Sequence, residues 1–331
     1  MIWLTWRQFR AQLFTALGAI VVLGAILAYT GPHLAHLYDT SGIAACQASH
    51  GDCSPLIDNF TSHYVWWHAL GPLLAAIPLL VGVFWGAPLL ARELETGTYR
   101  VAWTQSVTRR RWLATKLVVV GAASIATVGA FTLIVTLWSA PLDKVTGTRF
   151  APGTFSQRGI VPIAYAAFAF ALGVAAGAVF RKLLPAMTAT LAVFAVVRFT
   201  IQQWVRPHYQ TARQVASPLF GDRHLSSAVA RGDTTAVHAN DWIVSARVVD
   251  ATGRTVAISR DTIRNLCHLP EGDFSQRSLQ ACSQRLHLHS VLTVQPANRY
   301  WPFQGWEFGI FAVLTAALVT LTFWWTRRRI T

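Results

Sequence analysis

The chain has 331 residues, of which 53% are hydrophobic and only 13% are charged. Because charged residues make up about 25% of ordinary soluble domains, this composition excludes a chain whose only solvent is water. The formal net charge of +14 suggests nucleic acid, but the basic residues occur in short runs beside apolar segments and across one long loop. No basic stripe is interleaved with aromatic residues, so membrane topology explains the charge better. We expect a lipid bilayer as partner and no nucleic acid.

Six apolar segments approach the length of about 20 residues that a helix needs to cross a bilayer. The first is too long, and is followed by too little small-residue cleavage signal, for a removable signal peptide. The sequence therefore predicts a mainly α, polytopic helical membrane protein with six transmembrane helices. The predicted spans are residues 12–30, 68–90, 113–138, 160–180, 184–204 and 306–326.

The distribution of lysine and arginine predicts which segments face the cytoplasm. Basic residues mark the N-terminus, residues 91–116, the connection at Arg181 and Lys182, and the C-terminal tail, whereas residues 31–64 contain none. The long segment 204–301 holds many arginines, but long loops cross the membrane largely regardless of charge. We expect a multi-pass protein of the cell membrane with both termini in the cytoplasm.

The segment before the last span is too long for a simple connection, so it is expected to fold. Two β patterns flank the turn Asp250-Ala-Thr-Gly253, two helical patterns follow, and a third alternating run ends the segment. This predicts a small α+β extracytoplasmic domain between the fifth and sixth spans. The patterned stretches are residues 242–249, 254–258, 261–267, 275–286 and 287–294.

Four regions follow along the chain. Residues 1–11 combine an aromatic and a basic side, as in a helix that lies in the membrane interface. Residues 12–204 hold spans one to five, with a polar segment at 91–112. Residues 205–301 form the outer domain, and residues 302–331 hold the sixth span and a basic tail.

All four cysteines fall in segments predicted to lie outside, where disulfides persist. We expect two local pairs, Cys46 with Cys53 and Cys267 with Cys282. Free or metal-bound thiols are the alternative, because His50 and His268 lie nearby, although neither pair has the C-x2-C spacing of zinc sites. A second group of histidines matches no common ligand set, so we expect no metal. These are His33, His36, His63 and His68.

Two features of the spans bear on packing. Gly82 with Gly86, and Gly173 with Gly177, are four residues apart, which lets helix backbones approach closely. Tight packing within one subunit is the plainer interpretation of both pairs. The second span also contains three prolines, which predict a kink because each removes a backbone hydrogen bond. They are Pro72, Pro78 and Pro88.

The polar segment 91–112 is the most informative part of the sequence. Glu93 and Glu95 end the second span, and Thr96-Gly97-Thr98 is expected to break the helix. Residues 99–103 are expected to form one short helical turn, after which Ser106 or Thr108 caps the third span.

This segment resembles the cytoplasmic coupling element of permeases of the type-2 ATP-binding cassette (ABC) exporter family, in which a Glu-rich segment and a Gly-Thr turn follow the second span. Residues 1–12 and 296–307 are similar to the actinobacterial branch of that family. The resemblance implies a permease subunit that forms the translocation pathway, as a homodimer or paired with a second permease. It also implies coupling roles for Glu93, Glu95, Thr96, Gly97, Thr98 and Arg100.

The same resemblance implies a separate ABC ATPase subunit, since the chain contains no G-x-x-x-x-G-K-[ST] phosphate loop. ATP and Mg²⁺ then belong to that partner, and this chain is neither an enzyme nor the holder of a cofactor. The rival interpretation is a non-transporting membrane sensor or scaffold whose outer domain binds a ligand or partner. For Glu93 and Glu95, the structural alternative is a local ion-pair network with Arg92 and Arg100.

One charge lies inside a predicted span. Arg198 is about two turns from the outer end of the fifth span, where a charge near mid-membrane costs about 2.5–3.5 kcal/mol on insertion scales. Glu307, at the outer start of the sixth span, is a candidate partner for an intramembrane ion pair. Snorkelling of Arg198 to the interface and contact with a substrate remain the alternatives.

Overall fold

A computed structural model describes residues 2–49, 53–98, 108–146, 148–150, 152–218, 241–256, 260–268 and 276–329. Within this part of the chain, six helices are long and apolar enough to cross a membrane. Each overlaps one of the six predicted spans, so the mainly α, six-span fold class is confirmed. The spans cover Phe9–Ser49, Gly71–Thr96, Arg109–Trp138, Val161–Phe180, Leu183–His208 and Ala297–Arg328.

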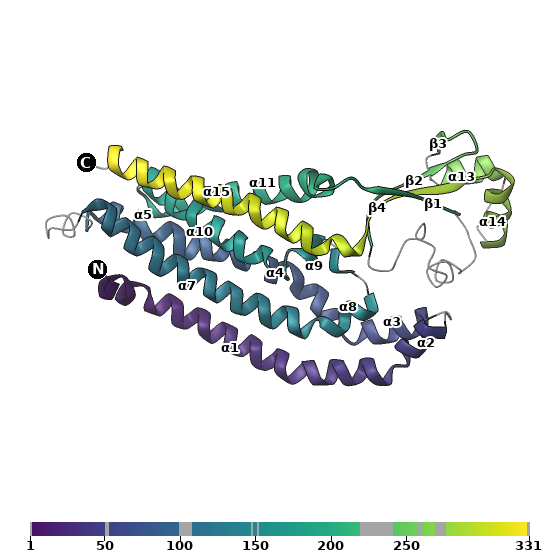
Figure 1. Cartoon of the computed structure of the whole chain (residues 1–331), viewed down its shortest axis with the longest axis horizontal. Coiled ribbons are helices and arrows are strands. Elements are labelled where there is room, and N and C mark those ends of the chain that lie inside the picture. The colour runs from purple at the N-terminus through teal and green to yellow at the C-terminus, as the bar shows by residue number, and fades with distance from the viewer. Residues whose placement is uncertain are drawn as a thin grey trace.

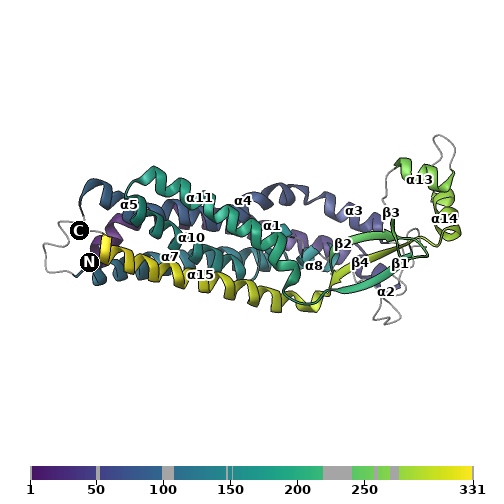
Figure 2. The same cartoon turned by 90° about the horizontal axis from the view of Figure 1, so that it is seen from above.

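The long helices run side by side, and both marked chain ends lie at the same end of the bundle (Figure 1). The small sheet lies at the opposite end, together with helices α13 (Arg260–Cys267) and α14 (Gln276–Arg285), and the turned view in Figure 2 shows the same arrangement. We call these two ends the terminal end and the sheet end.

The first helix, α1 (Ile2–Thr40), is much longer than the predicted span. At its start, no break separates the expected interfacial helix from the span. At its far end, Leu34 is fully buried in a cluster with Val135 and Trp138 of α7 (Arg109–Trp138), so the helix continues into residues expected to form a loop. Two short helices, α2 (Ile43–Ser49) and α3 (Ser54–Ser62), follow it.

The second span contains a π-helical segment. Helix α4 (Val65–Val81) passes through η1 (Gly82–Gly86) into α5 (Ala87–Thr96), and the Ala87 N–H bonds to the carbonyl of Gly82. Pro88 has no N–H to donate to the carbonyl of Phe84, and Gln12 Nε2 of α1 donates there instead, at 3.3 Å. The irregularity predicted from the prolines thus takes the form of a π segment.

The central helix is α10 (Val161–Phe180). In its most apolar 18-residue stretch, 78% of the residues are buried inside the protein, against 6% in the corresponding stretch of the first span. It contacts three helices that precede it in the chain, α4, α5 and α7. It also contacts two that follow it, α11 (Leu183–Thr200) and α15 (Tyr300–Arg329). Motion of any of these helices therefore has to be accommodated at α10.

Both predicted glycine pairs meet at this central helix. A Cβ added to Gly82 would lie 2.5 Å from the carbonyl oxygen of Ala169, and one added to Gly173 would lie 2.6 Å from the backbone nitrogen of Ala87. Gly86 and Gly177 make similarly close backbone approaches. The glycines therefore join the second and fourth spans within one subunit, as the plainer interpretation expected.

Short elements at the sheet end connect α7 to α10. They are α8 (Ala140–Thr146), η2 (Thr148–Phe150) and α9 (Pro152–Phe155). Phe150 and Phe155 are buried there, with Phe150 stacked on Trp242 at a ring-centroid distance of 6.0 Å. This aromatic contact joins the helical bundle to the strand-containing region between the fifth and sixth spans, which we call the sheet domain.

The sheet domain contains an antiparallel four-stranded sheet in the order β1-β4-β2-β3. The predicted hairpin is formed by β2 (Trp242–Val249) and β3 (Thr255–Val256), while β1 (Arg213–Pro218) was not predicted and pairs with β4 (His289–Gln295). Asp250 Oδ1 accepts hydrogen bonds from Thr252 and from the Arg254 N–H in the turn. These hydrogen bonds hold the pKa of Asp250 below its usual range, and the bond from the Thr252 side chain has the largest effect.

Both expected disulfides are present. Cys46 bonds to Cys53 between α2 and α3, and Cys267 bonds to Cys282 between α13 and α14. Each disulfide closes a short loop, which stabilises the folded state mainly by restricting the unfolded chain.

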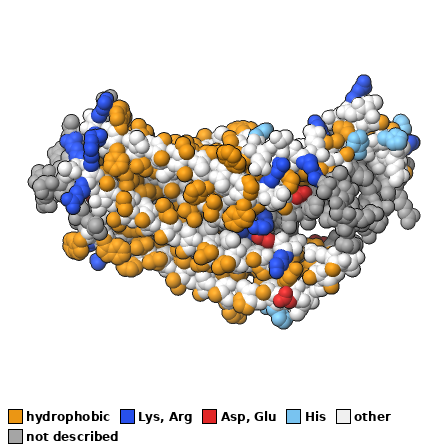
Figure 3. All heavy atoms as spheres, viewed as in Figure 1, with side chains coloured by type: hydrophobic (Ala, Val, Ile, Leu, Met, Phe, Trp, Pro, Cys, Tyr) orange, Lys and Arg blue, Asp and Glu red, His pale blue; other side chains and the backbone are white. Residues whose placement is uncertain are grey.

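The surface carries the pattern of a membrane protein. Figure 3 shows hydrophobic side chains over the middle of the bundle and several lysine or arginine side chains at the terminal end. On α15, Trp306 and Trp324 are exposed and lie about 27 Å apart along the axis at 1.5 Å per residue. This distance is close to the ~30 Å hydrocarbon core of a bilayer, and tryptophan is enriched at both of its faces.

Candidate functional site

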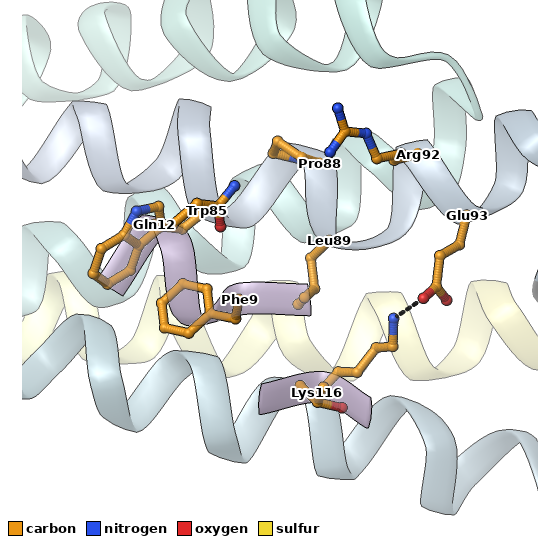
Figure 4. Close-up of a pocket in the computed structure, with 9 residues that line it drawn as sticks. Phe9, Gln12, Trp85, Pro88, Leu89, Arg92, Glu93 and Lys116 are labelled. Atoms are coloured by element: carbon orange, nitrogen blue, oxygen red, sulfur yellow. Dashed lines mark ion pairs between the residues drawn. The ribbon is translucent and has the colours of Figure 1, made fainter. Parts of the chain in front are cut away.

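The last turns of α5 are fixed to two other helices. Glu93 pairs with Lys116 of α7, with 2.5 Å between Oε1 and Nζ (Figure 4). The side chains are only 13% and 5% exposed, so this is a largely buried ion pair between the second and third spans. Removing one partner of a buried pair costs about 3–5 kcal/mol because the other charge is left uncompensated. The sequence had suggested Arg92 and Arg100 as the local partners of Glu93.

Glu95 bonds to a different helix. Its Oε2 accepts a hydrogen bond of 2.9 Å from the backbone N–H of Leu183, the first residue of α11. The N-cap residue Lys182 supplies no side-chain cap, and N–H groups in the first turn of a helix have no partner within the helix. A carboxylate at this position also interacts favourably with the helix dipole. Glu95 therefore caps the fifth span from the end of the second.

Gly97 ends α5 in the left-handed conformation, with φ +73°. Among the described residues, no atom lies within 4 Å of a Cβ built there, so backbone conformation and not space requires glycine at this position. Thr96 donates to the carbonyl of Arg92 at 2.9 Å and lies 3.1 Å from the Thr98 hydroxyl. The predicted break after Thr96 is thus present.

The third span begins as predicted, with the Thr108 hydroxyl accepting from the Arg111 N–H at 3.3 Å. Arg100 and the expected short helix at 99–103 lie outside the described residues. In the described part, the segment 93–98 is a joint at which one helix end contacts the third and fifth spans. We call it the α5 joint.

A second charged cluster is buried at the sheet end. Arg206, which is completely buried, places Nε 2.8 Å and Nη2 2.7 Å from the two carboxylate oxygens of Glu307 on α15. Tyr165 of α10 also donates to Glu307, and Tyr209 donates at 3.3 Å. Burial raises the pKa of Tyr209, which keeps the hydroxyl protonated as a donor. The bidentate geometry fixes α15 against the end of the fifth span.

The expected pairing of Glu307 with Arg198 is therefore corrected. Arg198 Nη1 donates to the carbonyl of Ala75 at 2.5 Å, and its guanidinium lies 5.0 Å from the centre of the Tyr165 ring. The helical segments η3 (Ile201–Val205) and η4 (Arg206–His208) continue beyond the predicted end of the span at residue 204. This continuation brings Arg206, counted from the sequence as part of the outer domain, level with Glu307.

A family model described as ABC-2 membrane transporter related matches residues 17–206. The match covers more than half of the chain. The chain belongs to the ABC-2 membrane transporter related family. No curated protein and no solved structure matches it.

The resemblance to type-2 ABC permeases is confirmed at the level of this ABC-2 family. The matched range begins inside the first span and ends near the end of the fifth, so it includes the α5 joint and Arg206 and stops before β1. The sheet domain and the sixth span lie beyond the match.

Sequence reasoning missed Gln304, which organises the sheet end of this ABC-2 family chain. Its Oε1 accepts from the N–H groups of Ile160 and Val161 at 3.0 Å each, at the start of α10. Its Nε2 donates to the carbonyls of Phe155 and Arg158 at 3.2 Å. The only signal in the sequence is a fully polar side chain within an apolar segment, which indicates a partner inside the bundle.

Proposed function

We propose that this chain is the permease subunit of an ABC exporter, forming the translocation pathway and driven by a separate ATPase subunit that binds ATP and Mg²⁺. Membership of the ABC-2 membrane transporter related family supports the transport assignment. The α5 joint carries the coupling part of the proposal, because Glu93 and Glu95 connect one helix end to two further spans.

In this proposal the ATPase contacts the cytoplasmic segment after Gly97. Displacement of that segment moves the end of α5, and the Glu93–Lys116 and Glu95–Leu183 bonds carry the movement to the third and fifth spans. Energy enters because ATP-bound and ATP-free partners contact the joint differently. Two permease copies, identical or paired with a second permease, complete the pathway in the cell membrane, with both termini in the cytoplasm.

The partner is tested by purifying the tagged chain together with the products of neighbouring genes. We expect a protein with a Walker A phosphate loop to elute with the permease and to hydrolyse ATP. Recovery of an intact chain without any ATPase would instead favour a sensor or scaffold.

The joint is tested in the same complex with Glu95→Ala and Gly97→Val. Both variants are expected to assemble with the ATPase. The ATPase in these complexes should lose the part of its ATP hydrolysis that requires the assembled permease. Gly253→Val is the matched control for the glycine, because Gly253 also has a positive φ, +79°, and open space around it, but lies in the sheet domain. Wild-type ATPase rates in both joint variants would refute the coupling role.

A further inference from the structure

A cavity of about 270 Å³ lies beside the Glu93–Lys116 pair, between α1, α5 and α7 (Figure 4). Its apolar lining comes from Phe9 of α1, from Trp85 of η1 and from Leu89 of α5. Phe9 and Trp85 meet edge to face, with 4.7 Å between ring centroids. The apolar part of a ligand, such as a hydrocarbon chain, therefore fits this side of the cavity.

The charges that line the cavity are unequal. Glu93 and Lys116 neutralise each other at 2.5 Å, whereas Arg92, which also lines the cavity, has an exposed side chain with no ion-pair partner in the described part of the chain. In Figure 4, Arg92 and Glu93 leave α5 in different directions, Glu93 toward Lys116 and Arg92 away from it. One positive charge thus remains at the rim above the apolar lining.

The cavity lies near the membrane face at the terminal end. Phe9 and Trp85 belong to a buried cluster against which Phe323 and Trp325 of α15 pack, next to the exposed Trp324. Exposed tryptophan on a spanning helix marks the interface between lipid and water. A ligand at this depth would place a head group level with Arg92 and an acyl chain level with the aromatic residues.

We propose that this cavity binds one anionic phospholipid, with the phosphate at Arg92 and an acyl chain against Phe9, Trp85 and Leu89. Basic sites between transmembrane helices recognise acidic lipid head groups because arginine forms charge-assisted hydrogen bonds to phosphate. A free inorganic anion would use Arg92 but leave the apolar lining uncovered, so the lipid gains contacts that the ion does not. The bound lipid would fill the space between α1 and α5, beside the α5 joint.

Native mass spectrometry of the delipidated chain, titrated with phosphatidylglycerol or phosphatidylcholine, tests this site without requiring transport. We expect phosphatidylglycerol to be retained at least about tenfold more tightly, and Arg92→Ala to abolish that preference, since a hydrogen bond to a charged group carries a factor of this order. Arg110→Ala is the matched control, because Arg110 is also exposed at the terminal end but does not line the cavity.

A second pair of variants separates loss of the charge from loss of folding. Leu89→Trp fills the cavity and is expected to expel phosphatidylglycerol, whereas Leu80→Trp, at an exposed position in the same span, is expected to leave binding unchanged. Size-exclusion chromatography confirms that each variant is intact.

Three outcomes would overturn the assignment. They are equal retention of both lipids by the unaltered chain, retention of phosphatidylglycerol by Leu89→Trp, and competition by inorganic phosphate as effective as by the lipid.

Discussion

At the scale of single residues, the α5 joint depends on helical geometry. Glu93 and Glu95 are two positions apart, so on an α-helix their side chains point about 200° apart. That spacing directs one carboxylate toward α7 and the other toward α11. The sequence shows the spacing, but the identity of each partner depends on which spans pack on either side of α5.

The cap provided by Glu95 gives the first prediction. Glu95→Ala removes the acceptor of the Leu183 N–H, and loss of such a cap costs about 1 kcal/mol, so hydrogen exchange of the first turn of α11 should accelerate roughly fivefold. Hydrogen–deuterium exchange of a peptide that begins several residues before Leu183 and covers the first turn of α11 measures this. Thr188→Ala is the control, because Thr188 bonds only within its own helix. Unchanged exchange at Leu183 would show that the contact does not persist in solution.

The buried ion pair of Arg206 and Glu307 gives the second prediction. Arg206→Met or Glu307→Leu alone leaves an uncompensated buried charge, and each should lower the free energy of unfolding by about 3–5 kcal/mol. Combining both substitutions should cost clearly less than the sum of the two. Thermal unfolding in detergent, followed by tryptophan fluorescence, provides the double-mutant cycle. Strictly additive losses would contradict a direct pair.

At the scale of helices and strands, the contact of the second and fourth spans is the most sensitive to small changes. In Gly82→Ala the new Cβ would lie 2.5 Å from the backbone oxygen of Ala169, which cannot rotate away as a side chain can. We expect a loss of about 1–3 kcal/mol in unfolding free energy, the usual cost of overpacking. Gly309→Ala on α15 is the control, since no atom lies within 4 Å of its built Cβ. Equal stability of the two variants would contradict the close approach.

The elements differ in how far the sequence alone predicts them. The six spans and the hairpin at Asp250 follow from local signals, namely apolar length and a turn between alternating runs. The extension of α1 to Thr40 and the strand β1 depend on long-range contacts, with α7 and β4 respectively. The same distinction holds at the site: Gly97 was predicted from its local turn, whereas the Arg206 partner of Glu307 required knowing that the helix continues past residue 204.

At the scale of the whole molecule, an even number of spans places both termini at one end, and the sheet domain lies at the other (Figure 1). The arrangement of the helices alone is compatible with either end facing the cytoplasm. The charge distribution favours one orientation, because short segments rich in lysine and arginine tend to stay in the cytoplasm and the terminal end carries several such side chains (Figure 3), so we expect the terminal end inside. The disulfides at the sheet end agree, since they persist in an oxidising compartment.

The last prediction tests this orientation directly. All four native cysteines are in disulfides, so one introduced cysteine is the sole free thiol of the chain. Thr98 at the α5 joint and Asp58 in α3 are both exposed and lie at opposite ends of the bundle. In intact cells, Asp58→Cys should react with a membrane-impermeant maleimide, and Thr98→Cys should react only after the membrane is permeabilised. Non-reducing peptide mapping confirms that the native pairs stay intact in each variant. Labelling of Thr98→Cys but not of Asp58→Cys from outside would show that the topology is the reverse of the one expected. The α5 joint would then face away from any cytoplasmic ATPase.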